Sequence, residues 1–197
     1  VLFGEEYTLV ACADYILGKN PGATVSNLSS TRALADITIA YGQSYTASAV
    51  GEVNVVTEMK NSKAVIGGEG NGGVIYPDSH YGRDALVGVV LFLSLLVERK
   101  LSVSQLRATY PKYFMSKNKI NLLQGMDVDG ILKKLEQNYS NERVTTIDGL
   151  KIDFEKAWIH LRKSNTEPII RIYTEAKTQK EAAALAERFD KEIKALF

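Results

Sequence analysis

Hydrophobic residues in the first part of the chain alternate between helical and extended spacing. Residues 4–22 place five apolar side chains on one face of a helix that Gly18 can end: Leu9, Val10, Ala13, Ile16 and Leu17. The alternation continues with a strand at 23–28, a helix at 30–42, an extended segment at 43–49, a helix at 52–61 and a short buried strand at 63–68. This order is typical of βαβ units, so it predicts a mostly parallel sheet with helices on both faces.

The loops that follow the strands are candidate sites, because ligands of parallel sheets bind at the carboxyl ends of the strands. Three loops qualify, at residues 28–32, 49–52 and 67–73. The helix after the first of these loops has Ser30 or Thr31 as its expected N-cap.

The most apolar stretch of the chain runs from Ala85 to Val97, with Asp84 before it and three charged residues after it. A bilayer span needs roughly 20 apolar residues, so this stretch predicts a buried core helix and no membrane segment. A shorter helix is expected at 102–110. Residues 111–122 show no clear period, and we place the boundary between two domains there, giving residues 1–116 and 117–197.

The second domain combines strand pairs with helices. We expect one helix at 127–140 and a last one at 178–196, where Thr178 and Glu181 have the spacing of a capping box. Asp148-Gly149 is a hairpin signal between two strands, and another pair of strands flanks residues 162–168. This pattern predicts an α+β domain with an antiparallel sheet and helices on one face, within a chain of the α/β class.

Composition and charge narrow the range of partners. Of the 197 residues, 45% are hydrophobic and 24% are charged, as in an ordinary globular protein. The net charge of +1 provides no global field for nucleic acid or an acidic membrane, so we expect neither partner and any anion site must be local.

The single cysteine, Cys12, excludes an internal disulfide and a cysteine-based zinc site, and it fits a reducing compartment. No signal peptide opens the sequence, and we expect a cytoplasmic protein. The sequence starts at Val1, which indicates either a fragment of a longer protein or a trimmed form of a complete one.

A turn at residues 162–168 gathers several groups that suit an anion. Its sequence is "RKSNTEP", and Arg171 follows on the outgoing strand. Arginine presents a planar fork that matches phosphate, and hydroxyl and backbone N–H groups around a turn can form a concave anion nest. The alternative is a solvated turn rich in turn-forming residues, with Pro168 fixing its exit.

A glycine-rich stretch, "GGEGNGGVIYP" at residues 67–77, surrounds one carboxylate and one amide. Glu69 and Asn71 are two residues apart, so in an extended loop both side chains face one way and suit paired sugar hydroxyls. The alternative is a flexible connector. Just beyond, Asp84 can cap the apolar helix, and Arg83 could reach a neighbouring loop, although a plain helix start is the favoured interpretation.

Groups for catalysis or for metal binding are not apparent in the sequence. The only histidines, His80 and His160, are far apart, and no Ser-His-Asp arrangement can be argued. Asp127 and Asp129 lack the spacing of a calcium loop. We therefore predict no catalytic residue and no metal ligand in this chain.

Three motifs together resemble the C-terminal half of an α-D-phosphohexomutase, the family of phosphoglucosamine mutases, phosphomannomutases and phosphoglucomutases. "RKSNTEP" resembles the phosphate-binding loop of the family's fourth domain, and "GGEGNGG" resembles the sugar-binding loop of its third domain. The segment "LSSTRALADITIAYGQSYTASAVGE" resembles the third-domain segment in which a helix leads to a V-G loop. The order and spacing of all three motifs match, over nearly the whole chain.

The resemblance implies roles for individual residues. Four residues of the turn would hold the substrate phosphate: Arg162, Ser164, Asn165 and Thr166. Three residues of the third domain would contact the sugar: Glu69, Asn71 and Gly51. The family's usual Ser and His in the sugar-binding loop are Asn71 and Gly73 here, and Glu52 stands where some members have a basic residue. The "GEGNGG" form resembles archaeal-type phosphoglucosamine mutases, which favours an amino sugar over mannose or glucose.

The resemblance also implies parts that this sequence lacks. In the family, a serine of the first domain carries the transferable phosphate, and a D-x-D-x-D-R loop of the second domain holds Mg²⁺; neither motif occurs here. Phosphoryl transfer relies on positioning and on a metal that neutralises developing charge. The implied partners are therefore a phosphosugar substrate, a bisphosphorylated sugar activator and the missing N-terminal domains, and this chain alone is expected to be inactive.

Two other interpretations stay open at this point. The chain could be a stand-alone, non-catalytic module that binds sugar phosphates, or a purely structural pair of domains. An open reading frame that extends upstream through the serine and aspartate loops would favour the mutase, whereas absence of phosphosugar binding would favour the structural alternative.

Overall fold

The computed structural model describes residues 2–121, 127–164 and 167–196. It divides the chain into two compact units, Val1–Lys112 and Tyr113–Phe197. We had placed the division between residues 116 and 117, a point that falls inside strand β5 (Phe114–Asn121), and this whole strand belongs to the second unit. The predicted class, an α/β chain with one mostly parallel sheet and one antiparallel sheet, is confirmed.

The first unit follows the predicted alternation of helices and strands. In chain order, its elements are α1 (Glu5–Lys19), β1 (Thr24–Asn27), α2 (Ala33–Ala40), β2 (Tyr45–Ser48), α3 (Glu52–Ser62), β3 (Ile66–Glu69), β4 (Gly73–Ile75), α4 (Ala85–Arg99) and α5 (Val103–Thr109). The sheet has the order β2-β1-β3-β4, with β1 parallel to both β2 and β3. Only β4, which the sequence did not predict, is antiparallel to its neighbour.

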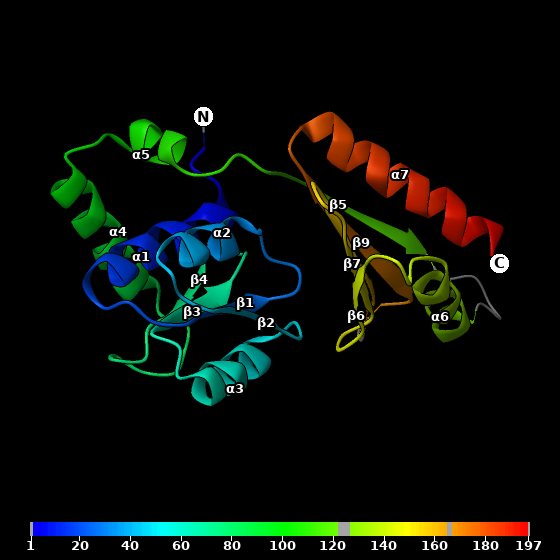
Figure 1. The fold of residues 1–197 in the computed structure, drawn as a ribbon, viewed down its shortest axis with the longest axis horizontal. Helices are drawn as coiled ribbons and strands as arrows, with labels where there is room; N and C mark the ends of the chain where they lie inside the picture. The colour runs from blue at the N-terminus through cyan, green and yellow to red at the C-terminus, as the bar shows by residue number, and fades with distance from the viewer. Residues whose placement is uncertain (1, 122–126, 165–166, 197) are drawn as a thin grey trace. The chain divides into compact units, whose positions relative to one another are not determined.

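Helices cover both faces of this sheet (Figure 1). On one face, α3 packs against a buried cluster that includes Val25, Met59 and Ile75. On the other face lie α1, α2 and α4, and the thiol of Cys12 in α1 donates a hydrogen bond to the carbonyl of Gly88 in α4 at 3.4 Å. This layering leaves the carboxyl ends of β1, β2 and β3 at one edge of the sheet, where a ligand site is expected.

The apolar stretch that begins at Ala85 forms α4, but only one face of this helix is buried. Gly88, Leu91 and Leu95 are buried, whereas Leu86 and Val97 are each 78% exposed. The prediction of a buried core helix therefore holds for one side of α4 alone. Among the described residues, no helix is both long enough and apolar enough to cross a membrane.

The second unit is built around a five-stranded antiparallel sheet of order β5-β9-β8-β7-β6. Its other elements are α6 (Val128–Asn138), β6 (Arg143–Thr145), β7 (Leu150–Asp153), β8 (Trp158–Lys163), β9 (Ile169–Ala176) and α7 (Gln179–Ala195). Both helices bury apolar residues in one core cluster with the sheet, among them Leu135 of α6 and Phe189 of α7. The expected arrangement of helices on one face is therefore confirmed, and α7 runs along the sheet in Figure 1.

Strand β5 lies where the sequence showed no clear period. It pairs with β9 along its full length, from Phe114 opposite Ala176 to Asn121 opposite Ile169. Of its eight residues only Ile120 is buried, so the alternation that identifies a strand is nearly absent from its sequence. Backbone pairing with β9, rather than side-chain burial, determines this strand.

The helix caps were predicted with mixed success. The second helix begins at Ala33 with Arg32 as N-cap, one residue beyond the predicted Ser30 or Thr31. The Thr31 hydroxyl nevertheless accepts a hydrogen bond from the Ala33 N–H at 3.3 Å. At α7 one half of the predicted capping box is present, because the Thr178 hydroxyl accepts a hydrogen bond from the Glu181 N–H at 3.1 Å.

His160 lies on β8 and is buried in the second unit, with 2% of its surface exposed. Its Nε2 donates a hydrogen bond to the carbonyl of Asp148 at 2.6 Å. Burial lowers the pKa of His160 from 6.5 to about 4, and the nearby cations Lys151 and Arg162 act in the same direction. The neutral imidazole is therefore part of the folded structure.

We expect the Thr178 cap to stabilise the second unit. Replacing Thr178 with alanine should lower the free energy of unfolding by about 1 kcal/mol, because one N–H at the start of α7 loses its acceptor. The measurement is urea unfolding followed by the fluorescence of Trp158, the only tryptophan of the chain, which lies in this unit. Thr178→Ser keeps the hydroxyl and is the control; equal stability of the two variants would contradict the prediction.

We also expect His160 to destabilise the second unit at acidic pH. Its pKa is lower in the folded chain than in the unfolded chain, so the stability that it provides is complete above about pH 6.5 and is lost as the pH falls toward 4. Between pH 8 and pH 5 this loss should be about 2 kcal/mol. His160→Gln retains an N–H donor without the titration, and urea unfolding at both pH values should show a smaller loss for this variant. An identical pH dependence of the two proteins would refute the assignment.

Candidate functional site

Glu69 is the last residue of β3 and lies at the carboxyl edge of the first sheet. Only 6% of its surface is exposed. Its Oε1 accepts a hydrogen bond from Asn27 Nδ2 at 2.9 Å, and its Oε2 lies 3.6 Å from Nη1 of Arg83. A carboxylate held in this way keeps a fixed orientation, and its Oε2 retains lone pairs for a ligand because 3.6 Å is longer than a hydrogen bond.

The loop after β1 supports Glu69 through Asn27. Asn27 Oδ1 accepts hydrogen bonds from the backbone N–H of Ser29 and from the hydroxyl of Ser30, both at 3.0 Å. The Ser30 hydroxyl in turn accepts a hydrogen bond from the N–H of Gly70 at 2.9 Å. This chain of hydrogen bonds joins the ends of β1 and β3. Loop 28–32 therefore positions the carboxylate of Glu69, which belongs to loop 67–73; both are among the three predicted ligand loops.

Asn71 lies on the exposed turn between β3 and β4. We had expected an extended loop in which Glu69 and Asn71 face the same way, but β3 ends at Glu69 and the chain reverses through residues 70–72. Asn71 Oδ1 accepts a hydrogen bond from the N–H of Gly73 at 3.1 Å, which closes a tight turn. Its amide NH₂ stays available for a ligand at the rim of the site.

Gly51 and Glu52 form the start of α3. Gly51 has a φ of 118°, a conformation that side chains with a Cβ rarely adopt. Glu52 accepts two hydrogen bonds from Arg83, one from its backbone N–H at 3.0 Å and one from its Nε at 2.8 Å. These bonds lower the pKa of Glu52, with the backbone bond as the first cause.

A cavity of about 520 Å³ opens between these elements. It is lined by the start of α3, the turn between β3 and β4, and the start of α4: Glu52, Asn71, Gly72, Gly73, Val74, Arg83, Asp84 and Ala85. Carboxylates, an amide and a guanidinium around backbone glycines can exchange hydrogen bonds with a polyhydroxylated ligand. The structure thus brings Gly51, Glu69 and Asn71 to one edge of the first unit.

The predicted phosphate turn joins β8 to β9 in the second unit. Ser164 is buried, and its N–H donates a hydrogen bond to the carbonyl of Ile169 at 2.9 Å across the base of the turn. Arg162 Nη1 lies 3.8 Å from a carboxylate oxygen of Asp148. The other two predicted phosphate ligands, Asn165 and Thr166, lie outside the described residues.

Three cationic residues stand side by side next to this turn. Arg162 of β8 pairs with Arg171 of β9, and Arg171 pairs with Lys119 of β5, so all three side chains lie on the face of the sheet opposite the helices. Like charges directly opposite one another on neighbouring strands are destabilising. Arg171 also contacts Glu167 at 3.4 Å, and together with the Asp148 contact this offsets part of the repulsion. A bound anion would offset more of it.

Three of these residues have little or no signal in the sequence. Asn27 was overlooked because a single amide at a strand end carries no motif. Arg83 was assigned to a helix start, although an arginine directly before an N-cap aspartate can turn back toward the sheet. Lys119 lay in a segment without a clear period, and only the pairing of β5 with β9 places it beside Arg171.

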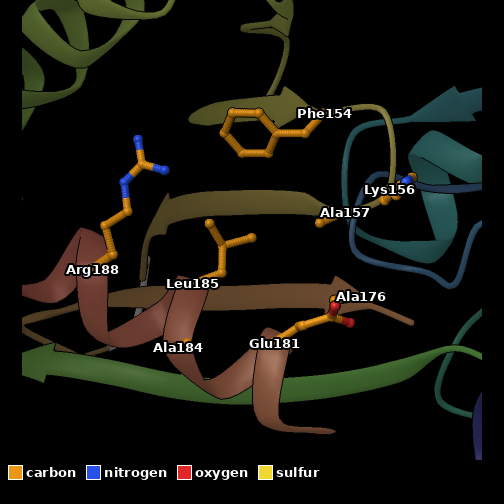
Figure 2. Close-up of a pocket in the computed structure, with 8 residues that line it drawn as sticks. All are labelled: Phe154, Lys156, Ala157, Ala176, Glu181, Ala184, Leu185 and Arg188. Atoms are coloured by element: carbon orange, nitrogen blue, oxygen red, sulfur yellow. The ribbon is translucent and has the colours of Figure 1, made fainter. Parts of the chain in front are cut away.

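The second unit contains another cavity, of about 390 Å³ (Figure 2). Figure 2 shows Leu185 and Arg188 extending from α7 toward Phe154, and three alanines, Lys156 and Glu181 complete the lining. None of the predicted site residues lines it. Within the described parts of the chain, no group of three or more His, Cys, Asp or Glu side chains could hold a metal ion.

Comparison with known proteins gives two matches to family models. The model described as phosphoglucomutase/phosphomannomutase, alpha/beta/alpha domain III, matches residues 4–113. The model of the C-terminal domain of the same family matches residues 115–192.

Similar proteins cover nearly the whole chain. A phosphoglucosamine/phosphogalactosamine mutase of Sulfurisphaera tokodaii is 36% identical over 178 residues, which are 88% of this chain and 39% of that protein. A phosphoglucomutase/phosphomannomutase of Thermococcus kodakarensis is 33% identical over 89% of the chain and 39% of its own length. This chain thus spans about two-fifths of the length of these relatives.

A solved structure of a phosphoglucomutase/phosphomannomutase family protein from Burkholderia thailandensis has the same fold, with a TM-score of 0.80 at 24% identity. The match covers 99% of this chain and 42% of the other. The order of the two matched domains agrees with the two units of the structure. This chain belongs to the phosphoglucomutase/phosphomannomutase family and contains its α/β/α domain III and its C-terminal domain.

Proposed function

We propose that this chain is the substrate-binding half of a phosphohexomutase, which interconverts hexose 6-phosphate and hexose 1-phosphate. The observation that carries the proposal is the fixed orientation of Glu69 at the carboxyl edge of the first sheet. A carboxylate with Oε2 available can accept hydrogen bonds from neighbouring sugar hydroxyls. Asn71 supplies an amide at the rim, and Gly51 allows the backbone to approach the sugar closely.

The phosphate of the substrate would bind at the turn between β8 and β9. Arg162 supplies the fork of donors and Ser164 a hydroxyl, and from the sequence we add Asn165 and Thr166. The row of cations described above supports this proposal, because an anion would relieve the repulsion between Arg162 and Arg171. The turn would hold the phosphate that is not reacting, while Glu69 binds the hydroxyls in both orientations of the sugar.

An amino sugar, glucosamine phosphate, is the substrate that we propose first, with mannose or glucose phosphate as alternatives. Carboxylates outnumber arginine and lysine side chains at the first cavity, because Glu52 and Asp84 line it together with Arg83, and Glu69 lies 3.6 Å from the Arg83 guanidinium. This balance favours a substrate with an ammonium group. A relative at 36% identity named for phosphoglucosamine and phosphogalactosamine supports the same choice.

Phosphoryl transfer itself would depend on parts of the protein other than this chain. Mg²⁺ neutralises charge in such reactions, and among the described residues no group of three or more His, Cys, Asp or Glu side chains could hold it. We propose that N-terminal domains supply the phosphoserine and the metal ligands, that a bisphosphorylated sugar acts as activator, and that the 197-residue chain alone is inactive. A cytoplasmic location is also proposed, and the free, buried thiol of Cys12 accords with it.

Variants of Arg162 test the phosphate site. Arg162→Lys keeps the charge but loses the two-pronged geometry, so it should weaken binding of glucosamine 6-phosphate, and Arg162→Ala should weaken it further. Loss of a charged hydrogen-bond donor is worth on the order of 1.5–3 kcal/mol, or about tenfold to a hundredfold in Kd. The alanine effect should shrink at high salt, since ions screen the charge.

Calorimetric titration of the chain with glucosamine 6-phosphate, at low and at high salt, gives these affinities. Lys180→Ala removes an equal charge from the exposed first turn of α7 and serves as the control. Equal affinities for all variants would leave the segment as a plain hairpin.

Variants of Glu69 test the sugar site. In a protein that also contains the N-terminal domains, Glu69→Ala should lower kcat about tenfold to a hundredfold, because a charged acceptor of sugar hydroxyls is lost. Binding of inorganic phosphate should change little, since the turn lies in the other unit. Coupled assays with glucosamine, glucose and mannose phosphates measure the effect, and the 197-residue chain alone should stay at background.

Glu98→Gln is a matched control, because Glu98 forms an exposed ion pair with Lys19 away from the cavity. Unchanged kinetics of Glu69→Ala with all three sugars would show that Glu69 has no sugar-binding role. Turnover by the 197-residue chain alone would overturn the assignment of the reaction to other domains.

A further inference from the structure

The backbone of Arg83 is fixed by its pairing with the neighbouring strand, independently of the contacts of its side chain. It forms an isolated antiparallel bridge with Ile75 at the end of β4. The following residue, Asp84, donates its N–H to the carbonyl of Val74 at 2.9 Å and caps α4 by accepting from Leu86 and Val87. The start of the Arg83 side chain is thus fixed relative to the sugar-binding loop.

The side chain of Arg83 then passes over Gly73. A Cβ added at Gly73 would lie 2.8 Å from Cδ and 3.3 Å from Cγ of Arg83. Both distances are shorter than ordinary carbon–carbon contacts of about 3.5–4.0 Å. Glycine at position 73 therefore provides the space that the arginine occupies, and a larger residue there would displace it.

The guanidinium of Arg83 connects two loops that carry proposed sugar ligands. Its Nε donates to Oε2 of Glu52 at 2.8 Å, and its Nη1 lies 3.6 Å from Oε2 of Glu69. Without a cation between them, these two carboxylates would repel each other. Asn27 fixes one oxygen of Glu69 and Arg83 attracts the other, so the plane of the carboxylate is determined from both sides.

Arg83 also faces the ligand space itself. Its side chain is 48% exposed and lines the 520 Å³ cavity. The printed sequence shows no other arginine or lysine between residues 64 and 98, so this segment contributes one cation to the site. Arginine has five N–H donors. The guanidinium makes one hydrogen bond, to Glu52, and a longer contact of 3.6 Å to Glu69, which leaves donors for ligand oxygens.

We infer that Arg83, in the space left by Gly73, is a positioning and specificity-determining residue of the sugar site: it orients Glu69 and ties the loop at Gly51–Glu52 to the sugar-binding loop. This inference rests on the proposed function, and the ligand class is the hydroxyl groups of a hexose phosphate. Because Gly73 and Arg83 share one space, their effects on the enzyme are coupled.

Four variants test the inference in a protein that also contains the N-terminal domains: Arg83→Ala, Arg83→Lys, Gly73→Ala and the double variant Gly73→Ala/Arg83→Ala. Arg83→Ala should lower kcat/KM about tenfold for the preferred sugar and less for the other hexose phosphates, so discrimination between sugars falls. Arg83→Lys should recover part of the rate but little of the discrimination, because an ammonium group cannot hold both carboxylates.

The coupling between the Gly73 and Arg83 substitutions distinguishes a positioning role of Arg83 from a general loss of stability. Gly73→Ala alone should reproduce most of the defect of Arg83→Ala, since the added Cβ displaces the arginine. Added to Arg83→Ala, the same substitution should change kcat/KM less than twofold. Gly18→Ala in α1, where the added Cβ meets only an ordinary contact of 3.5 Å, is the matched glycine control.

A readout without turnover uses the 197-residue chain itself. Hydrogen exchange in the peptide that covers residues 66–76 should be faster in Arg83→Ala, and exchange in α1 should be unchanged. Unaltered sugar discrimination in Arg83→Ala, or independent effects of the Gly73 and Arg83 substitutions, would overturn the inference. Loss of turnover in Glu69→Gln with a normal Arg83→Ala would refute only the role of Arg83, whereas full activity of Glu69→Gln would refute the proposed function.

Discussion

The arrangement of the loops in the first unit depends on one carboxylate that is buried at the sheet edge and requires hydrogen-bonding and charged partners. An ionised group with little exposure is unfavourable unless hydrogen bonds and opposite charges compensate for the lost water. Glu69 obtains them from Asn27 on the neighbouring parallel strand and from Arg83 beyond β4. Each of these partners is itself held, by the Ser29–Ser30 segment on one side and by Glu52 on the other. Four chain segments distant in sequence are therefore fixed by the requirements of one side chain.

In the second unit, the groups that need partners of opposite charge are cations. The register of its antiparallel sheet brings Lys119, Arg171 and Arg162 into one row, and the nearest acids contact two of them at 3.4 and 3.8 Å. Alternation along the same strands sends apolar neighbours such as Ile172 into the helix-covered core. The core thus determines the register, and the register determines where the cations lie. A slip by one residue would move them to the core face.

Local patterns sufficed for much of the fold and for part of the site. The periodic segments gave α1, α3 and α7 close to their observed bounds, and the Asp148-Gly149 signal located the turn between β6 and β7. Strands β4 and β5 were missed because their identity depends on pairing with β3 and β9 and not on their own patterns. Glu69 stood out as a lone carboxylate among glycines, but the roles of Asn27 and Arg83 follow from contacts over 42 and 14 positions that no local pattern encodes.

The hydrogen bond from Cys12 to Gly88 joins α1 and α4 at a side chain that can report on the opening of the first unit. The thiol is fully buried between α1 and α4, and burial raises its pKa to about 12. The thiolate is the reactive form, so an alkylating reagent at neutral pH finds almost none of it while the two helices stay together. The rate at which the chain's only cysteine is modified would therefore report how often α1 and α4 separate. No label has to be introduced to follow this opening, because the reactive group is a native side chain.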